Sequence, residues 1–160
     1  MATITADELE AELESARADL TNDRPDFSGR DFGGLTVNGL VFTGCNLSGS
    51  DFTDAKFDGC DFSGSNLAGC TFYGTRLNGV KLCGAELSGA DMAKADLTDS
   101  DLSGAHLPGV DLNDARLTGA ALKNANLAGA DLMGAIMPNG EVYDPATHED
   151  MLVTVWGAQR

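Results

Sequence analysis

The sequence predicts an all-β fold, a β-solenoid whose coils enclose one hydrophobic core, with a helix over its N-terminal end. A large apolar residue occupies every fifth position from Phe27 to Met137, which makes 23 units in a row. The position two residues earlier is small in every unit from Cys45 to Ala135, and the position two residues later is Gly in 17 of the 23 units. We call these three positions the centre, the small position and the corner.

A period of five fits neither an α-helix nor a flat strand. Five residues advance a helix by about 500°, so successive centres would form no stripe. On a strand, an odd period sends successive centres to opposite faces. The chain must therefore turn once in each unit, which returns every centre to a common interior.

The non-glycine corners support this turn. Lys94 is the one residue among them that departs from the pattern. The other five are Asp or Asn, the residues that best tolerate left-handed backbone after Gly, namely Asp54, Asp99, Asp114, Asn124 and Asn139.

The repeated unit resembles that of the pentapeptide-repeat family, which reads roughly Ala-(Asp/Asn)-Leu-X-X. Residues 95–99, 125–129 and 130–134 match it outright. The resemblance covers residues 25–139 as 23 repeats, and it implies a right-handed, four-sided β-helix. At the family's 20 residues per coil, these 115 residues make about 5.75 coils.

The leader, residues 1–24, supplies a cap for the exposed edge of the first coil. Thr5 and Glu8 form a capping box, which marks the start of a helix. We therefore expect a helix over residues 6–20, lying on the first coil with one apolar face made of Leu9, Leu13, Ala16 and Leu20. Arg30 occupies a small position in this coil, so its charge should reach solvent or the acids of the leader.

The tail, residues 140–160, follows a turn at Asn139-Gly140. Asp144 and Pro145 predict the N-cap and first residue of a short helix. Its apolar residues are Met151, Leu152, Val155 and Trp156. These residues either cap the last coil or form a homodimer contact, since the resemblance implies that some family members dimerise through this end.

The net charge of −15 excludes some partners. Direct nucleic-acid binding needs a basic surface, and anionic membranes repel an acidic protein. A protein partner with a basic surface remains, although the charge could serve solubility alone. No apolar run approaches the roughly 20 residues of a membrane span, and the N-terminus lacks the features of a signal peptide, so we expect a cytoplasmic protein.

Catalytic and metal-binding patterns are absent from the sequence. The two histidines, His106 and His148, have no metal-ligand spacing, and no C-x-x-C pair occurs. We expect Cys45, Cys60 and Cys70 to fill small inward positions and Cys83 to point outward. A filled rod offers no obvious cleft, so the sequence predicts no enzyme, no cofactor and no metal.

One outward column is strongly acidic if residues 20 apart stack. This acidic column, the candidate partner-binding surface, takes the residue before each centre: Asp31, Asp51, Thr71, Asp91, Asp111 and Asp131. The adjacent column is mildly basic, with Lys56, Arg76 and Arg116. The alternative is that Asp is simply the usual residue at this position, where it meets solvent or backbone.

Two functions fit these features. The first is a non-catalytic protein–protein interaction module that docks a basic partner on a flat side. The second follows from the resemblance, because some pentapeptide-repeat proteins are acidic dimers that mimic DNA and occupy the DNA-binding surface of DNA gyrase, a type II topoisomerase. The short rod and the basic residues Lys56, Arg76, Lys81 and Arg116 count against the second function.

Overall fold

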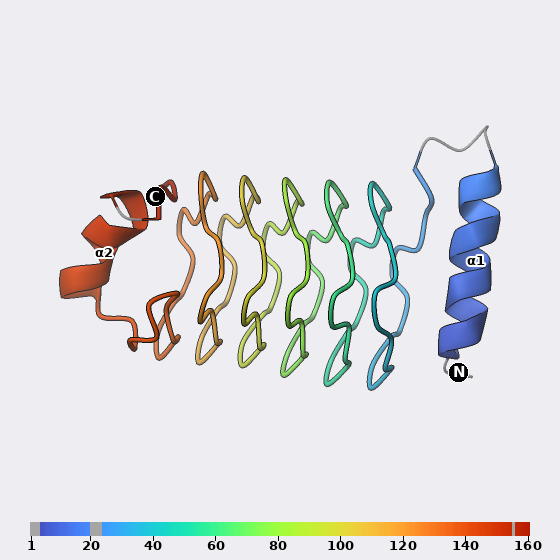
Figure 1. Ribbon diagram of the computed structural model, residues 1–160, viewed down its shortest axis with the longest axis horizontal. Helices are drawn as coiled ribbons and strands as arrows, with labels where there is room; N and C mark the ends of the chain where they lie inside the picture. Colours follow the sequence, from blue (N-terminus) through green and yellow to red (C-terminus); the bar gives the residue numbers. More distant parts are fainter. Residues whose placement is uncertain (1–3, 20–23, 155) are drawn as a thin grey trace.

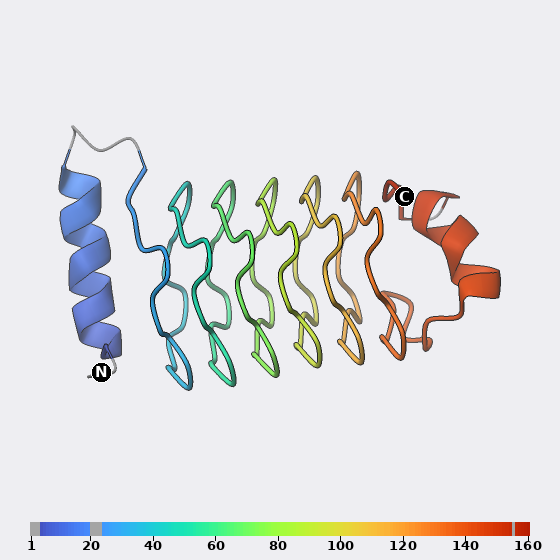
Figure 2. The ribbon, with the colours of Figure 1, turned by 180° about the vertical axis from the view of Figure 1, so that it is seen from behind.

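The computed structural model describes residues 4–19, 24–154 and 156–160. It shows a rod of stacked coils with one helix at each end (Figure 1). The N-terminal helix is α1 (Ala6–Ala18) and the C-terminal helix is α2 (Pro145–Thr154). The view from behind shows the same coils between the two helices (Figure 2).

Successive coils pair through residues 20 positions apart. The residue before each centre forms a parallel bridge with its counterpart in the next coil, from Asp26↔Asn46 to Arg116↔Ile136. Four such residues occur in each coil, so the rod has four sides, and each side runs from the residue before the centre to the corner. The first centres of sides 1, 2, 3 and 4 are Phe27, Phe32, Val37 and Phe42.

Each coil hydrogen-bonds to both neighbours in a fixed direction. Asp111 N–H donates to Ala90 O at 3.0 Å in the preceding coil, and Asp111 O accepts from Met92 N–H at 2.8 Å. Leu112 N–H points the other way and donates to Asp131 O at 2.7 Å. Only one residue per side pairs in this way, so the described residues contain isolated bridges and no continuous strand. The solenoid predicted from the sequence is therefore present, but a turn every five residues leaves only isolated bridges where the all-β class implies strands.

The core consists of the centres. All 23 are buried, and the seven phenylalanines gather in the N-terminal half of the rod. Phe42 stacks on Phe62 with a centroid distance of 4.7 Å, and Phe52 stacks on Phe72 at 4.6 Å. Such aromatic pairs add about 0.5–1.5 kcal/mol beyond their buried area.

Two corners differ from the sequence-based expectation. Lys94 adopts left-handed backbone with φ 59°, like the Asp corners, so it does not depart from the pattern. Asn139 is not left-handed, and Gly140 takes φ 85° instead. The repeat ends at this point, so no further coil holds Asn139 in register.

Helix α1 covers the first coil. Thr5 and Glu8 form the predicted capping box, and Leu9 and Leu13 are buried in the core. Arg30 forms an ion pair with Glu12, as expected for a charge at a small position. The helix ends at Ala18 rather than at the predicted residue 20, and Leu20 lies outside the described residues.

The tail folds onto the last coil, residues 120–139. Ala146 N–H donates to Asp144 Oδ1 at 2.9 Å, so Asp144 caps α2 as predicted. Leu152 is buried and Trp156, which follows the helix, packs against the core. Met151 is half-buried, and Val155 lies outside the described residues. These contacts favour the cap over the dimer contact for Leu152 and Trp156.

Candidate partner-binding surface

The acidic column lies along side 2. Consecutive bridges join Asp31 to Asp51, Asp51 to Thr71, Thr71 to Asp91, Asp91 to Asp111 and Asp111 to Asp131. The column is exposed at Asp31, Asp51 and Asp131 and half-buried at the other positions. The structure thus brings together all the residues that the sequence assigned to the candidate surface.

A local hydrogen bond positions each carboxylate of the column. Oδ1 of every Asp accepts from the backbone N–H two residues later, at distances from 2.8 Å for Asp51 to 3.1 Å for Asp131. Asn66 and Asn126 make the same bond on side 1. The repeat therefore favours Asp or Asn here for a structural reason. One oxygen of each Asp serves the turn, while the negative charge stays at the surface.

The same bond occurs at acids on the other sides. Ser103 donates to Asp101 through its backbone N–H at 2.9 Å. Hydrogen bonding by Ser103 lowers the pKa of the Asp101 carboxyl below its usual value. Thus Asp101 on side 4 stays ionised and provides a matched reference for the acids of side 2.

Side 2 gains further acids at its corners, which the sequence-based column did not include. Asp54 and Asp114 both lie there, and both adopt left-handed backbone. Across the described coils, side 2 has one basic residue, Lys94, against seven acids: Asp31, Asp51, Asp54, Asp91, Asp111, Asp114 and Asp131. We call these seven residues the acidic side.

The other three sides are close to neutral. Side 1 has two acids, Asp26 and Glu86, and no Lys or Arg. Side 3 has three bases balanced by three acids, and side 4 has two of each. Side 3 is therefore not basic as a whole, because Asp58 and Asp99 join Asp96, and Asp58 pairs with Arg76. Six net negative charges lie on side 2, whereas residues 25–137 together carry seven.

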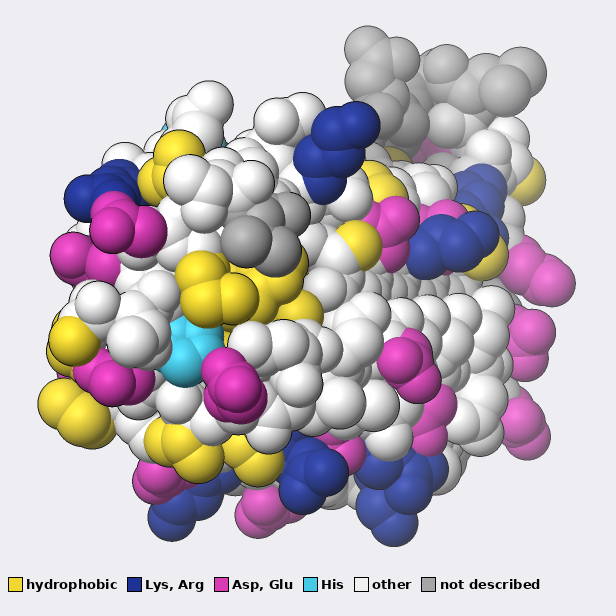
Figure 3. Space-filling view, turned by 60° about the vertical axis from the view of Figure 1, so that its left-hand side comes forward, with side chains coloured by type: hydrophobic (Ala, Val, Ile, Leu, Met, Phe, Trp, Pro, Cys, Tyr) yellow, Lys and Arg dark blue, Asp and Glu magenta, His cyan; other side chains and the backbone are white. Residues whose placement is uncertain are grey.

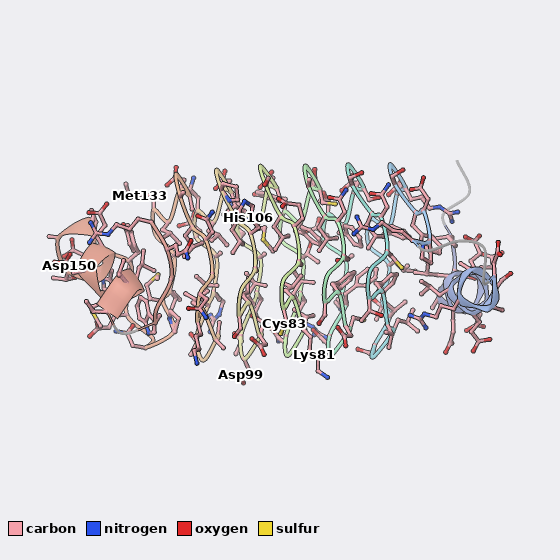
Figure 4. All side chains as sticks on the ribbon, turned by 90° about the horizontal axis from the view of Figure 1, so that it is seen from above. Lys81, Cys83, Asp99, His106, Met133 and Asp150 are labelled. Atoms are coloured by element: carbon pink, nitrogen blue, oxygen red, sulfur yellow. The ribbon has the colours of Figure 1, made fainter. Side chains whose placement is uncertain are left out.

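An aromatic and an apolar side chain interrupt the acidic side. Tyr73 is 38% exposed and Met133 is 68% exposed. Lys94 Nζ donates to the Tyr73 hydroxyl at 2.8 Å and lies 5.2 Å from the centre of the ring, and this hydrogen bond raises the pKa of Lys94. In Figure 4, Met133 and His106 lie on one side of the rod axis, opposite Lys81, Cys83 and Asp99.

The cysteines follow the predicted pattern. Cys45, Cys60 and Cys70 are buried and unpaired, and Cys83 is partly exposed. Burial raises the pKa of Cys60 to about 11 and that of Cys70 to about 12. In the described part of the chain, no three His, Cys, Asp or Glu residues form a group that could hold a metal ion. None of its helices is long and apolar enough to cross a membrane.

Comparison with known protein families identifies the type of repeat. A profile of pentapeptide repeats in nine copies matches residues 32–82, and a second profile in eight copies matches residues 65–104 and 100–139. The chain belongs to the pentapeptide-repeat family. None of the curated protein sequences matches the chain.

Solved structures of pentapeptide-repeat proteins share the fold. Rfr23 from the cyanobacterium Cyanothece is 22% identical, with a TM-score of 0.57, and the match covers 82% of this chain and 99% of Rfr23. A pentapeptide-repeat protein from the thylakoid lumen of Arabidopsis thaliana is 30% identical, with a TM-score of 0.55 and coverages of 82% and 76%. QnrB1, a plasmid-mediated fluoroquinolone resistance protein, is 17% identical with a TM-score of 0.49, which is too low a similarity to bear on function.

Proposed function

We propose that this pentapeptide-repeat protein is a non-catalytic docking module whose acidic side binds a basic surface of a partner protein. The observation that carries the proposal is the segregation of charge, with seven acids and one base on side 2. In this proposal the rod is the right-handed helix of about 5.75 coils that the family resemblance implies, and its two end helices act as caps. It requires no cofactor.

The geometry of the acidic side suits docking. Stacked charges of one sign steer an oppositely charged partner and raise its association rate. The Oδ1 hydrogen bonds orient the column carboxylates before binding, which lowers the entropy lost on association. Tyr73 and Met133 add the aromatic and Met contacts that are enriched in protein interfaces.

A cytoplasmic location belongs to the same proposal. The chain has four unpaired cysteines, and structural disulfides are rare in reducing compartments. The protein would then meet its partner inside the cell.

The docking proposal is tested by capture from an extract of the native host. The acidic-side variant carries Asp91→Asn, Asp111→Asn and Asp131→Asn, and the control variant carries Glu86→Gln, Asp96→Asn and Asp101→Asn on other sides. All six acids accept a hydrogen bond from the N–H two residues later, so both variants change charge by the same amount at equivalent positions. A partner of the acidic side should be lost with the first variant and retained with the second.

DNA mimicry remains the rival hypothesis, with DNA gyrase as the partner. It would use the same acidic side, but it predicts a specific effect on one enzyme. A DNA mimic should inhibit supercoiling by DNA gyrase, and the inhibition should weaken as salt screens the charges. Supercoiling that is unaffected by the protein would leave the general docking module as the better explanation.

A further inference from the structure

The tail closes sides 1 and 3 of the last coil, and it also contacts the corner of side 4, where Asn124 N–H donates to Gly157 O at 3.0 Å. On side 1, Gln159 N–H donates to Ala125 O at 2.6 Å, and Leu127 N–H donates to Gln159 O at 2.9 Å. On side 3, Tyr143 N–H donates to Ala135 O at 2.7 Å. Gln159 therefore continues side 1 by one more parallel bridge, to Asn126. This bridge shows that a single extended residue fits the edge of the last coil.

Side 2 of the last coil has no such closure. Among the described residues, Leu132 N–H and Ala130 O have no hydrogen-bond partner. Their counterparts one coil earlier are both paired with Asp131: Leu112 N–H donates to its O at 2.7 Å, and Val110 O accepts from its N–H at 2.9 Å. An unpaired donor and acceptor in this arrangement form an open edge for another backbone segment.

A pocket lies against this open edge. Its volume is about 170 Å³, and apolar side chains from the last coil and α2 line it, namely Leu127, Leu132 and Leu152. Glu149 and Arg160 also contribute to the lining. Ligand pockets for drug-sized molecules run from about 300 to 1,000 Å³, so this one suits a single side chain. Figure 3 shows the C-terminal end, where hydrophobic side chains lie among acidic and basic ones.

Side 4 of the last coil is also unpaired at Leu122 N–H and Ala120 O, within the described ranges. Leu122 and Leu132 are both buried, but the acceptor residue differs, because Ala120 is buried and Ala130 is half-buried. Side 2 also differs from side 4 in having the pocket, which lies against Ala130 and Leu132. Side 2 is thus the edge that an incoming chain can reach.

We propose that this edge binds an extended peptide segment of a partner, which adds one more bridge to side 2. The repeat itself gives the geometry. The bridging residue would donate its N–H to Ala130 O and accept from Leu132 N–H, as Asp131 does with Val110 and Leu112 one coil earlier. This is strand addition at an open edge, in which backbone hydrogen bonds provide affinity and side-chain pockets provide specificity.

The register also selects the side chains of the peptide. The bridging residue would stack above Asp131, so a Lys or Arg there would face its carboxylate. The following residue would take a centre position, so a large apolar side chain would enter the pocket and extend the stack of Leu112 and Leu132. The preferred segment is therefore a basic residue followed by a large apolar one. This preference rests on the proposed function, because it places a basic partner at the end of the acidic side.

Amide hydrogen exchange measured by NMR tests the edge directly, and the protein at 16.6 kDa suits the method. In the free protein, Leu132 N–H should exchange faster than Leu112 N–H and Leu127 N–H, which are paired. The probe is a synthetic heptapeptide with Lys-Leu at its centre and Ser and Thr around it. It should slow exchange at Leu132 and leave Leu127 unchanged. Binding should be weak, on the order of 1 mM, since two backbone hydrogen bonds and one side chain supply it.

Three matched peptides separate the contributions. Methylation of the Lys backbone nitrogen removes the donor to Ala130 O, and Lys-Ala removes the apolar side chain; each should weaken binding at least tenfold. Gln-Leu removes only the charge and should weaken binding a few-fold, as expected for an exposed ion pair. The Asp131→Asn variant should bind Lys-Leu no better than the wild-type protein binds Gln-Leu.

Several results would overturn the proposal. The proposal is wrong if Leu132 N–H exchanges as slowly as Leu127 N–H in the free protein, or if it shows no response to millimolar Lys-Leu peptide. Protection that grows with protein concentration in the absence of peptide would identify a second copy as the occupant. If Gln-Leu binds as tightly as Lys-Leu, the edge site stands but the basic preference taken from the proposed function is wrong.

Discussion

The carboxylate of Asp99 fills the space beside Gly119, which lies 20 residues later at the same corner of side 3. A Cβ on Gly119 would clash with Oδ1 of Asp99 and lie 3.4 Å from its Cγ. Asp54 stands in the same relation to Gly74, and Asp114 to Gly134. A Cβ at the corner of the following coil must therefore displace the carboxylate of a corner Asp, a relationship between coils that a single repeat unit does not reveal.

Gly119→Ala should destabilise the protein more than Gly104→Ala. Gly104 has φ 67° and open space around it, and Gly119 has φ 71° with Asp99 beside it. Both substitutions place Ala in left-handed backbone, at about 1–2 kcal/mol, and Gly119→Ala must also displace the Asp99 carboxylate. Urea denaturation measures the difference. Adding Asp99→Gly to Gly119→Ala should abolish the excess, and equal losses for the two single variants would contradict the packing between corners.

Leu102→Asp should cause severe loss of stability. Leu102 is 1% exposed, and a buried carboxylate without a partner costs several kcal/mol. The control is Ala121→Asp, an exposed site before a centre on the same side, where Asp is the usual residue. Thermal melting followed by circular dichroism should show a large drop for Leu102→Asp and little change for Ala121→Asp. An unchanged melting temperature for Leu102→Asp would mean that position 102 does not face the core.

The period of five determined most of what the sequence could predict. It placed the centres inside and the corners outside, because a repeat of this length forces one regular path. The column of residues 20 apart came from the family resemblance, which implies four sides; the period alone does not give the number of sides. Lys94 shows how strongly register acts, since it adopts the left-handed backbone of its neighbours despite its side chain. Asn139 shows where that influence ends, at the last coil.

The distribution of charge and the tail were harder to predict. Asp54 and Asp114 belong to the acidic side, but the sequence identifies them only as corners, and it is the stacking of the coils that places their charges on side 2. No sequence pattern indicated the bridge between Asn126 and Gln159, because the tail has no repeat and its path depends on tertiary contacts. The pocket beside Leu132 follows from that path and could not be foreseen.

Only Cys83 should react readily with a thiol reagent in the folded protein. Cys45, Cys60 and Cys70 are buried, whereas Cys83 is partly exposed. Burial and the nearby Asp101 raise the pKa of Cys83, so its reaction should be slow at neutral pH and accelerate as pH rises. Titration with a chromogenic disulfide should count one thiol before unfolding and four after it. Fast reaction of more than one thiol in the native protein would contradict the inward positions.

The buried thiols also predict a loss of stability at alkaline pH. Their ordinary pKa is 9.0, and burial raises the pKa of Cys60 to about 11 and that of Cys70 to about 12. An unfolded chain would ionise these thiols above pH 9 while the folded one would not. Their stabilising contribution is therefore complete below pH 9 and falls as pH rises toward 11 to 12. In the double variant Cys60→Ala, Cys70→Ala, the free energy of unfolding should fall less steeply with pH. An equally steep fall would show that other groups cause the loss of stability.

Trp156→Ala should loosen the tail without changing the molecular mass. Trp156 stacks on the buried His148 ring at a centroid distance of 6.1 Å and packs against the core. Loss of the indole should speed amide exchange at Gln159 N–H, which closes side 1. The circular dichroism of the coils should stay unchanged. Light scattering provides the control, since a wild-type dimer that becomes a monomer in the variant would support the dimer contact instead of the cap.

The association rate of the captured partner tests the central claim, that charge gathered on side 2 guides docking. Stopped-flow measurements would compare the wild-type protein with the acidic-side variant (Asp91→Asn, Asp111→Asn, Asp131→Asn) and the control variant (Glu86→Gln, Asp96→Asn, Asp101→Asn) at low and high salt. We predict that only the acidic-side variant associates more slowly, with a flatter dependence on salt. Equal slowing by the two variants would contradict the claim, because net charge alone would then explain the binding.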